Sequence, residues 1–104
     1  MPKYWGSTRR TRAHRALLET LIEVRVGAGL SQRDLAERLE LPRSYVSKIE
    51  TGERRVDPVE CVAWAEACGA KPLGFFRRLL QALRAASTLA AATRAGSLRP
   101  GARR

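Results

Sequence analysis

Apolar residues recur along the chain at the spacing of α-helices. Between about residues 13 and 29, large aliphatic side chains lie three and four positions apart, on one face of a helix that ends at Gly27 or Gly29. They are Leu17, Leu18, Leu21 and Ile22. No segment alternates apolar and polar residues over a useful length. The pattern therefore predicts an all-α fold.

Four further helices are predicted after the first. Ser31 and Asp34 have the spacing of a capping box and open a short second helix. Prolines stand where the remaining patterns begin, at the one helical position that needs no amide proton: they are Pro42, Pro58 and Pro72. Asp57 before Pro58 strengthens the start of the fourth helix. The fifth helix has the stripe Leu73, Phe76, Leu79, Leu80 and Leu83.

The chain divides into a central domain and two flanks. We expect a basic N-terminal arm at residues 1–12 and a five-helix domain at residues 13–85. Residues 86–104 are rich in Ala, Thr, Gly and Arg without large apolar spacing, which predicts a disordered basic tail. An extension of the fifth helix is the alternative for this tail.

The net charge of +10 is distributed unevenly. Residues 1–15 hold five basic groups and no acid, residues 16–76 hold eight basic and ten acidic groups, and residues 77–104 hold seven arginines and no acid. Such flanks indicate a polyanionic partner, with nucleic acid first and an anionic membrane surface second. Flanks that only increase solubility are the alternative.

Several classes of site are disfavoured by the composition. The absence of a signal peptide and of an apolar run near the roughly 20 residues of a membrane span predicts a soluble, cytoplasmic protein. Cys61 and Cys68 are expected to be small packing residues, with an intermolecular redox pair as the alternative. His14, the single histidine, is expected to be solvated. We therefore predict no metal site, no cofactor and, without a paired nucleophile and base, no enzyme activity.

The second and third helices are joined by only Leu39, Glu40 and Leu41, so they must cross at a steep angle. On the third helix, predicted at residues 42–51, Val46 and Ile49 point inward. The outward residues are polar and free of acids, which suits a helix in the major groove of DNA: they are Ser44, Ser47, Lys48 and Thr51, with Arg43 at the tip.

These segments carry a family resemblance. GLSQRDLAERL at residues 29–39 and SYVSKIETGERR at residues 44–55 closely resemble the phage repressor/Cro-type (XRE-like) helix-turn-helix regulators. The resemblance covers about residues 17–80. It implies a five-helix, lambda-repressor-like DNA-binding domain from a bacterium or phage, associated with the nucleoid.

The resemblance also implies roles for individual residues. Those that match base-contacting positions are Arg43, Ser44, Ser47 and Lys48. Those expected at DNA phosphates are Gln32, Arg33, Tyr45, Thr51, Arg54 and Arg55.

Two further expectations concern the helix-turn-helix itself. Arg25 and Glu50 fall on the inner faces of the first and third helices, where opposite charges should pair, and the family has an ion pair at the matching positions. Glu40 occupies the turn position where the family usually has a left-handed glycine, and a residue other than glycine is expected to cost roughly 1 kcal/mol there.

The fourth helix is apolar on two sides, so either another part of the chain or a second subunit must cover the second stripe. Members of the family commonly dimerise through C-terminal helices. The candidate dimer interface is Trp64, Cys68, Phe75, Phe76 and Leu79.

Together these features predict a sequence-specific transcriptional regulator, most readily a repressor, that binds a pseudo-palindromic operator as a homodimer. The alternative is a helix-turn-helix module, such as an antitoxin or anti-activator, that acts by binding another protein. A third hypothesis is nonspecific binding of RNA or anionic membranes through the flanks alone.

Overall fold

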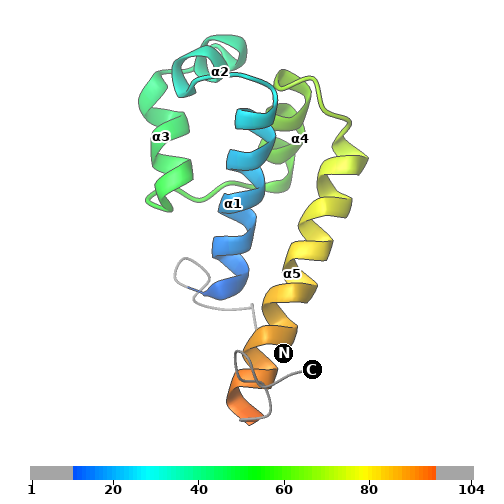
Figure 1. Cartoon of the computed structure of the whole chain (residues 1–104). Helices are drawn as coiled ribbons and strands as arrows, with labels where there is room; N and C mark the ends of the chain where they lie inside the picture. Colours follow the sequence, from blue (N-terminus) through cyan, green and yellow to red (C-terminus); the bar gives the residue numbers. More distant parts are fainter. Residues whose placement is uncertain (1–10, 96–104) are drawn as a thin grey trace.

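The computed structural model describes residues 11–95, with side chains for residues 11–87. Over this range the chain forms five α-helices and no strand (Figure 1). They are α1 (Arg12–Gly27), α2 (Gln32–Leu39), α3 (Arg43–Thr51), α4 (Pro58–Ala67) and α5 (Pro72–Ala95). The predicted all-α, five-helix fold is confirmed.

Local capping interactions explain where α2 and α4 begin. The hydroxyl of Ser31 accepts a hydrogen bond from the Asp34 amide, and the Asp34 carboxylate accepts one from the Ser31 amide, each at 3.0 Å. These bonds hold the pKa of Asp34 below its ordinary value. Asp57 and Glu60 form the same reciprocal pair at the start of α4, with Pro58 at its first turn. Each pair satisfies two amide protons that a helix N-terminus leaves unbonded.

All five helices contribute to one hydrophobic core. Its largest fully buried side chains are Leu21, Leu35, Val46, Ile49, Trp64 and Phe75. The indole Nε1 of Trp64 donates a hydrogen bond to the Leu21 carbonyl at 3.0 Å, which joins α4 to α1 and satisfies a buried polar group. This bond fixes α4 to α1, and α3 also packs against α1.

The last helix lies antiparallel beside α1 for much of its length (Figure 1). Phe75 is only 1% exposed and lies in the core, and Arg78 forms a surface ion pair with Glu23 at 2.9 Å. Leu73 and Leu80 are 78% and 47% exposed, so these two members of the predicted apolar stripe lie outside the core. The helix is rotated so that Phe75, rather than Leu73, enters the core.

The boundary predicted at residue 85 falls within α5, which continues to Ala95. The alternative of an extended fifth helix therefore holds up to that residue. Alanine is frequent in this part of the sequence and has the highest intrinsic helix propensity. Most of the predicted arm, residues 1–10, and the end of the predicted tail, residues 96–104, lie outside the described residues.

Three of the five residues predicted for a dimer interface are buried within a single chain. Trp64, Cys68 and Phe75 belong to the core, so this part of the prediction is wrong, and Phe76 and Leu79 are half-buried on α5. The core of the chain itself thus covers the stripe of α4 that contains Trp64 and Cys68.

Both cysteines are unpaired and buried, as expected for packing residues. Burial raises the pKa of the Cys61 thiol to about 11. His14 is 9% exposed, so its expected solvation is wrong.

No helix within the described range has the length and apolar character needed to cross a bilayer. The same residues bring together no group of three or more His, Cys, Asp and Glu side chains that could hold a metal ion.

Candidate nucleic-acid interface

The turn between α2 and α3 keeps a tight, regular geometry without a glycine. Glu40 has φ 58° and ψ 44°, which is the left-handed helical region. The Leu41 amide donates to the Ala36 carbonyl at 2.9 Å and the Glu40 amide to the Glu37 carbonyl at 3.1 Å. This is the Schellman pattern that glycine usually closes. The turn therefore sets the crossing of α2 and α3 with a strained, left-handed backbone at Glu40.

The buried face of α3 fixes which of its residues remain outside. Val46 and Ile49 are fully buried, as predicted. The opposite face is open to solvent: Arg43, Ser44, Lys48 and Thr51 are exposed and Ser47 is half-buried. Between residues 43 and 49 the sequence contains no acid. The predicted base-contacting residues thus share one exposed, acid-free face.

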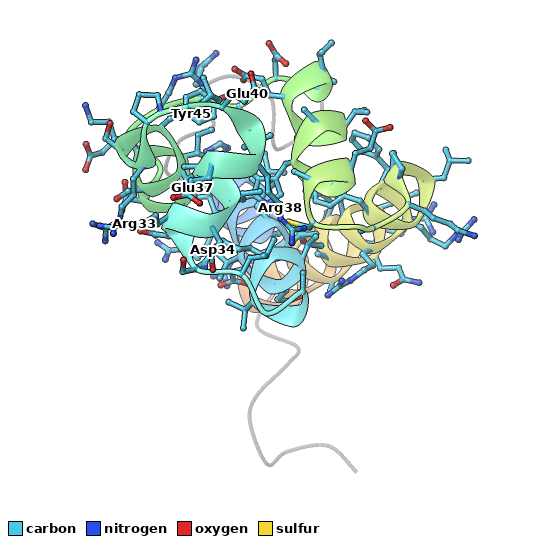
Figure 2. All side chains as sticks on the ribbon, turned by 90° about the horizontal axis from the view of Figure 1, so that it is seen from above. Arg33, Asp34, Glu37, Arg38, Glu40 and Tyr45 are labelled. Carbon is cyan, nitrogen blue, oxygen red and sulfur yellow. The ribbon has the colours of Figure 1, made fainter. Side chains whose placement is uncertain are left out.

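Three basic side chains around α3 are available to an anionic partner. Within the part of the chain that the structure describes, the side chains of Arg43, Lys48 and Arg55 make no hydrogen bond and no ion pair, and all three residues are exposed. Thr51, also exposed, donates its hydroxyl proton to the Lys48 carbonyl at 3.1 Å. Arg33 projects outward from α2 (Figure 2). An approaching phosphate therefore meets cations that need not break another bond first.

A groove of about 480 Å³ lies between the beginnings of α2 and α3. Its lining contains three arginines and no acid: Arg25, Ser31, Gln32, Arg33 and Arg43. Helix N-termini add partial positive charge at such places, and no side chain caps the start of α3. The groove is chemically suited to a phosphate group.

Arg25 and Glu50 form the predicted ion pair. Arg25 Nε lies 2.6 Å from Glu50 Oε2 and Nη2 lies 3.1 Å from Oε1, while Nη1 donates to the Leu30 carbonyl at 2.7 Å. The exposed fractions of the two side chains are 13% and 5%. Each charge is therefore both largely buried and paired, and the pair joins α1 to α3.

Gln32 contacts the same carboxylate. Its Nε2 donates to Glu50 Oε1 at 2.9 Å, a bond that the sequence did not predict. A side-chain amide has two N–H groups, so the second remains for a phosphate in the adjoining groove. The predicted phosphate role of Gln32 is compatible with this geometry.

A second cluster joins Tyr45, Arg54 and Glu60. The Tyr45 hydroxyl donates to Glu60 Oε2 at 2.7 Å, and Arg54 Nη1 lies 3.3 Å from the same oxygen. The Arg54 guanidinium also stacks over the Tyr45 ring, 4.4 Å from its centroid, and donates to the Arg55 carbonyl. We call these three residues the Tyr45 cluster.

Ionisation within the Tyr45 cluster follows from these contacts. Burial opposes ionisation of Glu60, but hydrogen bonds from Tyr45 and the Asp57 amide, with Arg54 nearby, hold its pKa below the ordinary value. Burial and the bond to Glu60 raise the pKa of Tyr45 to about 12. Because the single Tyr45 proton is donated to Glu60, the phenol cannot donate to a phosphate in this conformation, contrary to its predicted role.

Two residues that position the helix-turn-helix could not be predicted from the sequence. Glu60 lies three residues after Asp57, a spacing that indicates only the capping box, and its bond to Tyr45 crosses 15 positions. Arg38 extends toward α4 (Figure 2) and donates to the Ala67 carbonyl at 2.9 Å. Neither long-range partner follows from helical periodicity.

Comparison with known proteins agrees with this geometry. The model of a helix-turn-helix family matches residues 21–76. A solved XRE-family like protein from Pseudomonas syringae pv. tomato str. DC3000 is 39% identical, with a TM-score of 0.63, over 66% of this chain and 84% of that one. Among curated proteins, none matches the chain significantly.

Proposed function

The chain belongs to the XRE-type helix-turn-helix family of DNA-binding regulators, and from this membership we propose that it is a sequence-specific repressor. The observation that carries the proposal is the exposed face of α3, where Arg43, Ser44, Ser47 and Lys48 lie together without an acid. Arginine and lysine recognise guanine edges in the major groove, and a serine hydroxyl can accept or donate a hydrogen bond there.

The backbone contacts follow from the neighbouring cations. Arg33, Arg55 and the free N–H of Gln32 flank the recognition face, and phosphate contacts of this kind set orientation and affinity. We assign the basic flanks of the sequence the same supporting role. In this proposal the protein acts in the bacterial cytoplasm, as a product of either a bacterium or a phage.

Homodimerisation completes the proposed function. Two copies would place their α3 helices in successive major grooves, about 34 Å apart, on a pseudo-palindromic operator. Of the predicted interface residues, Phe76 and Leu79 remain partly accessible for this contact. Sedimentation of the complex with one operator duplex should give two chains per duplex.

The decisive experiment is selection of bound sequences from random duplexes at physiological salt. A palindromic motif enriched at least about a thousandfold over random duplex, the low end for specific binders, supports the proposal. An Arg43→Ala, Lys48→Ala variant should lose the motif but keep weak nonspecific binding. Uniform, steeply salt-dependent binding by the wild type would contradict sequence-specific regulation.

A second function, binding of another protein, is favoured by the outer face of α5. Leu73 and Leu80 are exposed there one heptad apart, beside the exposed Arg77 and Arg84. Since the chain has no acid after Glu66, a second α5 cannot neutralise these arginines. The face therefore fits an acidic amphipathic helix of a different protein.

A Leu73→Ser, Leu80→Ser variant distinguishes the two functions. If the chain acts on DNA alone, this variant should bind the operator and regulate a reporter like the wild type. Unchanged operator binding with lost regulation in cells would instead support a partner on this face.

A further inference from the structure

The Tyr45 cluster gives Arg54 a different status from its neighbour Arg55. Both arginines were predicted to contact phosphates, and both are exposed in the loop between α3 and α4. Arg55 has no partner among the described side chains, whereas Arg54 has three: the Glu60 carboxylate at 3.3 Å, the Tyr45 ring at 4.4 Å and the Arg55 carbonyl at 2.9 Å.

Glu60 is itself held firmly in place. Its Oε1 accepts the Asp57 amide at 2.9 Å and its Oε2 accepts the Tyr45 hydroxyl at 2.7 Å. The carboxylate therefore occupies a fixed position defined by α3 and by the start of α4. A fixed, partly buried anion beside Arg54 provides the charge that a DNA phosphate would otherwise supply.

Arg54 Nη1 makes both the contact with Glu60 and the hydrogen bond to the Arg55 carbonyl, so turning this nitrogen toward a phosphate breaks both, and lifting the guanidinium from Tyr45 ends the stacking. Its release would also leave the Glu60 carboxylate without its cation near the polyanionic DNA backbone. Both effects oppose a contact between Arg54 and DNA.

We propose that Glu60 withholds Arg54 from the DNA backbone and so limits the affinity of the protein for nonspecific DNA. Of the two loop arginines, only Arg55 then neutralises a phosphate in the wild-type complex. Phosphate contacts raise affinity for every sequence equally, so withholding one lowers nonspecific binding without altering base recognition. This inference rests on the proposed DNA-binding function.

The test measures binding to random duplex across a salt series for Glu60→Gln and for Glu66→Gln, a control that removes the same charge from an exposed position of α4. Glu60→Gln should steepen the slope of log K against log salt by about 0.9, the value for one added phosphate contact. If Glu60→Gln and the wild type bind equally at 1 M salt, this change of slope makes the variant bind about fivefold more tightly than the wild type at 0.15 M salt. Glu66→Gln should change the slope far less.

Two further variants identify Arg54 as the group released. Adding Arg54→Ala to Glu60→Gln should abolish the gain. Arg54→Ala alone, which leaves the capping box intact, should keep the wild-type slope. Thermal unfolding of each variant establishes that the folded protein is compared.

Either of two results overturns the inference: a slope for Glu60→Gln equal to that of Glu66→Gln, or a wild-type slope that Arg54→Ala flattens by about one unit. The second would place Arg54 on a phosphate in the wild-type complex. In both cases the wild type still binds DNA, so the proposed function stands. A wild type that does not bind DNA at any salt concentration would overturn both.

Discussion

The guanidinium of Arg25 and the carboxylate of Glu50 meet in a two-pronged ion pair that connects α1 to α3, with nitrogen–oxygen distances of 2.6 and 3.1 Å. Glu50 lies one residue after the buried Ile49 and two after the exposed Lys48. The pair therefore fixes the rotation of α3 about its own axis. The face proposed to contact bases therefore points outward while Glu50 points toward α1.

Loss of either member of this pair should destabilise the fold strongly. Arg25→Ala or Glu50→Ala leaves the other charge buried without its partner, which costs about 3–5 kcal/mol. Arg78→Ala is the matched control, because its pair with Glu23 is exposed and such pairs contribute about 1 kcal/mol or less. Urea unfolding compares the three variants. Equal, near-zero changes would contradict a structural role for Arg25 and Glu50.

Glu40→Gly should stabilise the protein by roughly 1 kcal/mol. The wild-type residue has φ 58°, which costs an L-residue about this much and glycine almost nothing. Glu40→Ala separates conformation from side-chain charge, since alanine keeps the strain and removes the carboxylate. A gain for alanine as large as that for glycine would attribute the effect to charge instead.

Lys48 and Arg55 should affect DNA binding in different ways. Lys48→Ala removes a side chain from the exposed α3 face, so we expect relaxed specificity at one operator position and a loss of about 1–3 kcal/mol on the preferred sequence. Arg55→Ala should weaken all sequences alike and reduce the salt slope by about one unit. Competition binding with single-position operator variants measures both. Identical profiles for the two variants would refute the distinct roles.

Two apolar residues at the start of α5 should differ greatly in their effect on stability. Phe75→Ala removes a fully buried ring and should cost about 3–5 kcal/mol. Leu73→Ala changes a side chain that is largely in water and should stay within about 0.5 kcal/mol of the wild type. Thermal and urea unfolding suffice for the comparison. Similar losses at both positions would mean that α5 is seated with a different rotation.

The stability of the protein should fall at alkaline pH, partly through Cys61. Burial raises the pKa of this thiol from 9.0 in the unfolded chain to about 11, so its contribution is full below pH 9 and is lost as pH rises through 11. Tyr45, with a pKa raised to about 12, adds a later loss above pH 10. The difference between the wild type and Cys61→Ala isolates the thiol and should shrink between pH 9 and 11. A pH-independent difference would contradict a buried, neutral Cys61.

Local patterns predicted where the helices begin better than they predicted the rotation of α5 about its own axis. Ser31 with Asp34 and Asp57 with Glu60 mark helix starts through neighbours three residues apart, and both capping boxes are present. Phe75 and Phe76 are adjacent and equally apolar, so periodicity alone cannot decide which enters the core. Packing against α1 decides it, and that contact is distant in sequence.

The same distinction applies to the site. The Arg25–Glu50 pair could be predicted because both residues lie on inner helix faces that apolar neighbours define. The Tyr45 cluster could not, because Arg54 lies in a loop without periodicity and Glu60 already has a local explanation. Only the fold reveals that Arg54 and Arg55 differ.

The position of Phe75 in the core has a consequence for protein synthesis. All of α2 and α3 leaves the ribosome before the segment that completes the core between α1 and α4. Until Phe75 emerges, the nascent chain contains all of α2 and α3 but lacks a complete hydrophobic core. Since domains fold as units, these helices are not yet held in their final positions. Truncated chains that end before α5 should therefore not compete with the finished protein for its DNA, and chaperones and proteases would meet them as unfolded polypeptides.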